Sequence, residues 1–167
     1  MKKKISKEYS FAVREAAFLV AELYFKPQEY RSLSLKRSTC EKYYKATIKN
    51  KKNKLSYLSI HPITEYAFKR NFIILMTGVC AESKIQNLTN FNKSPIKSEL
   101  NKMADIASNI FQGNKVTQAY INYIIEESKF ILSMQPYRQL ILIYAKELIS
   151  SKTISIKKVE EIFERYN

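Results

Sequence analysis

The chain has 167 residues, with 29 Lys and Arg against 15 Asp and Glu, and a formal net charge of +14. Hydrophobic residues make up 46% of the sequence, which is enough for a packed core and excludes an intrinsically disordered chain. Its two glycines exclude a glycine-rich phosphate loop, and its one histidine excludes any site that needs two imidazoles. The length predicts a single domain over residues 1–167.

The first predicted element is a helix over residues 7–25. Four alanines between residues 12 and 21 favour the helix, and Pro27 ends it. Apolar residues occur on several of its sides, so we expect this helix to be buried on more than one face. Charged residues interrupt its apolar run, so the basic start of the chain is not followed by a signal-peptide core.

Residues 26–60 form a basic region in which a small sheet is predicted. Apolar and polar residues alternate in segments 32–35, 44–48 and 55–60, a pattern typical of strands. The polar tract 50–54 is a plausible hairpin turn between the last two segments. We expect an antiparallel sheet of three strands.

A helical bundle over about 62–167 is predicted to follow. Pro62 and the Ser94–Pro95 pair mark two helix starts, Pro136 opens a third, and Ser155 caps the last helix. The expected helices cover about 62–85, 95–111, 115–133, 136–149 and 156–166. The predicted fold class is therefore α+β and predominantly helical: a first helix, a small antiparallel three-stranded sheet, and about five helices.

The positive charge is concentrated in residues 26–54, which hold ten basic and two acidic residues. A basic face of this kind attracts polyanions, and tyrosines are interleaved with its lysines as in surfaces that stack single strands. Only six of the 29 cations are arginine, however, and a solvated basic surface is the preferred explanation of the charge. The candidate polyanion face consists of Lys45, Lys49, Lys51, Lys52 and Lys54.

The remaining chemically reactive residues give no catalytic pattern. Cys40 and Cys80 are not spaced as a metal knuckle, and we expect both to be reduced thiols, with Cys80 buried. His61 lacks visible catalytic partners and precedes a helix start, where a structural role suffices. No segment has the roughly 18 apolar residues of a membrane span, so we expect a cytoplasmic protein without a membrane partner.

Three segments, taken in order, resemble the FtsH-type zinc metallopeptidase domain, which we expect here to stand alone, without the ATPase module that normally precedes it. They are Arg14-Glu15-Ala16-Ala17-Phe18-Leu19-Val20-Ala21, Leu75-Met76-Thr77-Gly78-Val79-Cys80-Ala81-Glu82, and Ser98-Glu99-Leu100 with Met103-Ala104-Asp105-Ile106-Ala107. The resemblance implies a first helix carrying two histidine ligands around a glutamate base, a small sheet, and an acidic third ligand on a later helix.

The departures from that pattern imply an inactive member. Arg14 and Phe18 stand at the two histidine positions, and neither side chain has a lone pair to donate to zinc. Glu15 stands at the general-base position and Glu99 at the third ligand position, with Glu82 as a nearby carboxylate. A single carboxylate does not hold zinc, so we expect neither metal nor other cofactor, and no catalytic residues.

We predict that Arg14 replaces the metal's positive charge by pairing with Glu99, or with Glu15 or Glu82, while Phe18 fills the volume of an imidazole. The alternative is that Arg14 is an ordinary surface residue. The function implied is binding to another protein, of unknown identity, in the former substrate cleft between the sheet edge and the first two helices. A nucleic-acid-binding protein using the 26–54 face is the alternative, and an enzyme of unrelated mechanism is a third.

Overall fold

The computed structural model describes residues 6–27, 29–36, 62–86, 96–111 and 113–166. The elements in these residues, in chain order, are α1 (Lys7–Phe25), β1 (Leu33–Ser34), α3 (Pro62–Gln86), α4 (Lys97–Phe111), α5 (Asn114–Ser133), α6 (Gln135–Ser151), β2 (Thr153–Ile154) and α7 (Ile156–Tyr166). The predicted class, α+β and predominantly helical, is confirmed. No described helix combines the length and apolar composition needed to cross a bilayer.

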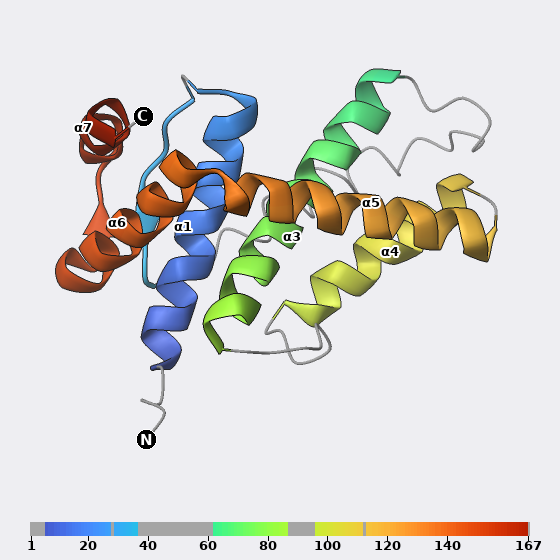
Figure 1. Ribbon diagram of the computed structural model, residues 1–167, viewed down its shortest axis with the longest axis horizontal. Coiled ribbons are helices and arrows are strands. Elements are labelled where there is room, and N and C mark those ends of the chain that lie inside the picture. Colours follow the sequence, from blue (N-terminus) through green and yellow to red (C-terminus); the bar gives the residue numbers. More distant parts are fainter. Residues whose placement is uncertain (1–5, 28, 37–61, 87–95, 112, 167) are drawn as a thin grey trace.

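The helices are arranged around a central pair formed by α1 and α3 (Figure 1). Helices α5 and α6 follow one another across one face of this pair, so that α5 packs on α3 and α6 packs on α1. Helix α4 packs against α5 and, to a lesser extent, α3, whereas α7 packs against α6. The core therefore lies where α1 and α3 meet the two crossing helices.

Helix α1 is buried over most of its length. The Ser6 side chain caps it by accepting a hydrogen bond of 3.1 Å from the backbone N–H of Tyr9, which satisfies one free donor of the first turn. Every residue from Ala12 to Ala21 is buried, including those on opposite sides of the helix. The predicted bounds of this helix, and its burial on more than one face, are confirmed.

Helix α7 begins at a side-chain cap, and one buried hydroxyl joins it to α6. The Ser155 side chain accepts a hydrogen bond of 3.2 Å from the backbone N–H of Lys158, which confirms the predicted cap of the last helix. The Tyr144 hydroxyl on α6 donates to the Val159 carbonyl oxygen on α7 at 2.8 Å. The second hydrogen bond joins α7 to α6, against which Val159 is buried.

The prediction of a three-stranded sheet is wrong in one respect. Its first strand, which corresponds to β1, pairs with a strand near residue 154 that was not predicted. β1 pairs antiparallel with β2, with Leu33 opposite Ile154 and Ser34 opposite Thr153. The partner strand was not predicted, because two residues after a helix are too short to show an alternating pattern. Lys152 adopts the left-handed conformation (φ 63°) that turns the chain from α6 into β2. The other two predicted strands, 44–48 and 55–60, lie outside the described residues.

Candidate functional site

The residues singled out by the sequence meet at a buried ion pair between α1 and α3. The Arg14 Nη1 atom lies 3.1 Å from Glu82 Oε2, and the two side chains are only 5% and 4% exposed. The Ser10 hydroxyl donates to the other carboxylate oxygen, Glu82 Oε1, at 2.9 Å. Ser10 and Arg14 are four residues apart and so lie on one face of α1. Both oxygens of the Glu82 carboxylate therefore have partners on the same helix face.

The guanidinium of Arg14 contacts an aromatic ring in addition to the Glu82 carboxylate. Its Cζ atom lies 5.0 Å from the centre of the Phe11 ring, a cation–π contact within one turn of α1. The Nε atom is buried and has no hydrogen-bond partner among the described residues. A buried cation in this setting depends strongly on its carboxylate, because it has lost its hydration. The alternative that Arg14 is an ordinary surface residue is wrong.

One turn further along α1, Phe18 packs closely against Gly78 of α3. The Phe18 ring is fully buried, and a Cβ atom built on Gly78 of α3 would lie 2.1 Å from its Cε1 atom. Only glycine, which has no side chain, leaves room for the ring at this position. Since Arg14 meets Glu82 and Phe18 meets Gly78, α1 and α3 run antiparallel through the site.

The two other positions predicted from the resemblance are Glu15 and Glu99. Glu15 is completely buried on α1, beside Arg14 in sequence. Glu99 is half-buried in the first turn of α4 and makes no ion pair with Arg14 in the described part of the chain. The carboxylate that pairs with Arg14 is thus Glu82, the last named of the three predicted alternatives. The structure brings Arg14, Phe18 and Glu82 together at one interface.

Sequence reasoning missed Ser10 and the contact partner of Phe18. Ser10 gave a usable signal, because it lies one helical turn before Arg14 and its hydroxyl can reach the same carboxylate. Gly78 lies within the second of the three segments that carry the resemblance, and a glycine inside a helix often marks close packing. The five lysines of the candidate polyanion face, together with Cys40 and His61, lie outside the described residues.

Cys80 follows Gly78 by two residues on α3 and is a buried free thiol, as predicted. Burial raises the pKa of the Cys80 thiol from 9.0 to about 11, and the charge of Lys129 only partly opposes this shift. The thiol is therefore protonated and weakly nucleophilic at neutral pH.

We expect Cys80, in a Cys40→Ser background, to react with a thiol reagent at pH 8 about 100-fold more slowly than in urea-unfolded chain. Its folded-state pKa lies above the unfolded value, so its contribution to stability is present below pH 9 and lost between pH 9 and about 11. Labelling rates followed over pH 7–11 check this. A rate that levels off near pH 9 in the folded protein would contradict it.

Three comparisons with known proteins found no match for this chain. No protein-family model matches this chain, and no curated protein or solved structure matches it. Within the described residues, no group of three or more His, Cys, Asp or Glu side chains is placed to hold a metal ion. The chemistry of the site therefore has to be argued from its own side chains.

Proposed function

We propose that this chain is a catalytically inactive, metallopeptidase-like domain that acts by binding another protein. The observation that carries the proposal is the ion pair between Arg14 and Glu82 inside the α1–α3 interface. At the positions where the resemblance to the FtsH-type domain implies zinc ligands, Arg14 and Phe18 offer no lone pair. Catalysis through a metal-bound water has no ligand set at these positions.

The two substituted residues also complete the interface in physical terms. The guanidinium of Arg14 neutralises a carboxylate that would be costly to bury alone. The Phe18 ring fills the space over Gly78. A site that has exchanged metal ligands for a salt bridge and a packed ring supports a role in maintaining the fold. The binding function then belongs to another part of the surface.

The predicted binding cleft between the sheet edge and the first two helices is not open along α1. All ten residues from Ala12 to Ala21 are buried, so this part of α1 presents no surface to a partner. Large apolar side chains are exposed instead on α3 and α5, including Tyr66 and Phe130. Exposed aromatic residues of this kind are enriched in protein–protein interfaces.

Zinc titration and a proteolysis assay test the proposal that the domain is catalytically inactive. We expect the purified protein to bind no stoichiometric zinc in calorimetric titration, and to leave unfolded casein intact whether or not zinc is added. Zinc binding gained by the double variant Arg14→His/Phe18→His would support the inferred ligand positions, because it restores an imidazole pair one helical turn apart around Glu15. One tightly bound zinc per wild-type chain, or casein cleavage abolished by a chelator, would overturn the proposal.

A further inference from the structure

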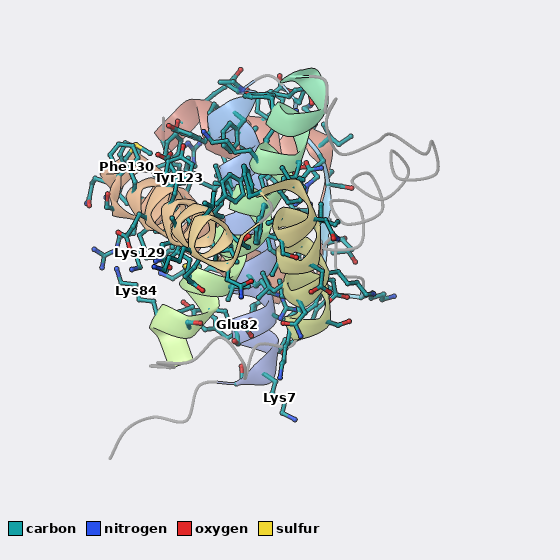
Figure 2. All side chains as sticks on the ribbon, turned by 90° about the vertical axis from the view of Figure 1, so that its right-hand side faces the viewer. Lys7, Glu82, Lys84, Tyr123, Lys129 and Phe130 are labelled. Atoms are coloured by element: carbon teal, nitrogen blue, oxygen red, sulfur yellow. The ribbon has the colours of Figure 1, made fainter. Side chains whose placement is uncertain are left out.

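We draw no further inference here: the strongest candidate, the exposed apolar stripe on α5 that includes Tyr123 and Phe130 (Figure 2), carries no proposal because nothing in the residues that the structure describes shows what covers it.

Discussion

We expect Arg14→Ala to lower the free energy of unfolding by about 3–5 kcal/mol, because it leaves the Glu82 carboxylate buried without its cation. The Ser10 hydroxyl donates to Glu82 Oε1, whereas Arg14 contacts the other oxygen, Glu82 Oε2. Urea denaturation followed by circular dichroism measures the change as a lower midpoint at constant slope. The effect is large because water cannot replace the guanidinium in this interior position.

Two control variants separate the buried charge from a general effect of removing a cation. Lys158→Ala removes one partner of an exposed pair with Glu161 on α7 and should cost less than about 1 kcal/mol. Arg14→Met/Glu82→Met replaces both buried charges by apolar side chains and should recover most of the loss. The assignment of a stabilising ion pair is refuted if Arg14→Ala costs no more than Lys158→Ala.

We expect Gly78→Ala to lower the free energy of unfolding by about 2 kcal/mol, even though alanine is the better helix former by about 1 kcal/mol. The new methyl group would lie 2.1 Å from Phe18 Cε1, and the fully buried ring cannot move into solvent. Overpacking therefore outweighs helix propensity at this position. Thermal and urea unfolding of the single variant measure the net effect.

The effect of Gly78→Ala on the free energy of unfolding should change sign when Phe18 is also replaced by alanine. In a Phe18→Ala background the ring is gone, so Gly78→Ala should raise stability by about 1 kcal/mol through helix propensity alone. Gly113→Ala controls for the added methyl group, because no atom lies within 4 Å of its Cβ; since Gly113 is the N-cap of α5, where glycine is preferred to alanine, we expect a loss of about 1 kcal/mol or less in both backgrounds. Equal effects of Gly78→Ala in both backgrounds would refute the proposed contact.

The helical part of the fold was predictable because its signals are local. Alanine content and Pro27 define α1, and Ser155 defines the start of α7, within a few residues of each end. The sheet was not predictable in the same way. β1 finds its partner at the far end of the chain, and an alternating pattern says that a strand exists but not which strand pairs with it.

Three members of the candidate site, Arg14, Phe18 and Glu82, were named from the sequence, but Ser10, the role of Gly78 and the pairing were not. The resemblance selected Arg14, Phe18, Glu82 and Glu99, and the absence of lone pairs on the first two argued for a changed role. Glu82 lies on α3 and Glu99 on α4, so the partner of Arg14 depends on which helix packs against α1 and in which register, and no local pattern encodes this. The contact between Phe18 and Gly78 shows the same register, and it is visible only once the two helices are placed side by side.

The interior position of α1 has a consequence for biosynthesis. This helix leaves the ribosome before α6, which packs along it and is made only after the intervening helices. A nascent chain that stops before α6 already contains α3, the other main partner of α1, but the side of α1 that α6 covers stays exposed, and transiently exposed apolar surface is prone to aggregation. The packing of α1 is therefore complete only after α6, which follows α3, α4 and α5 in the chain, has been made.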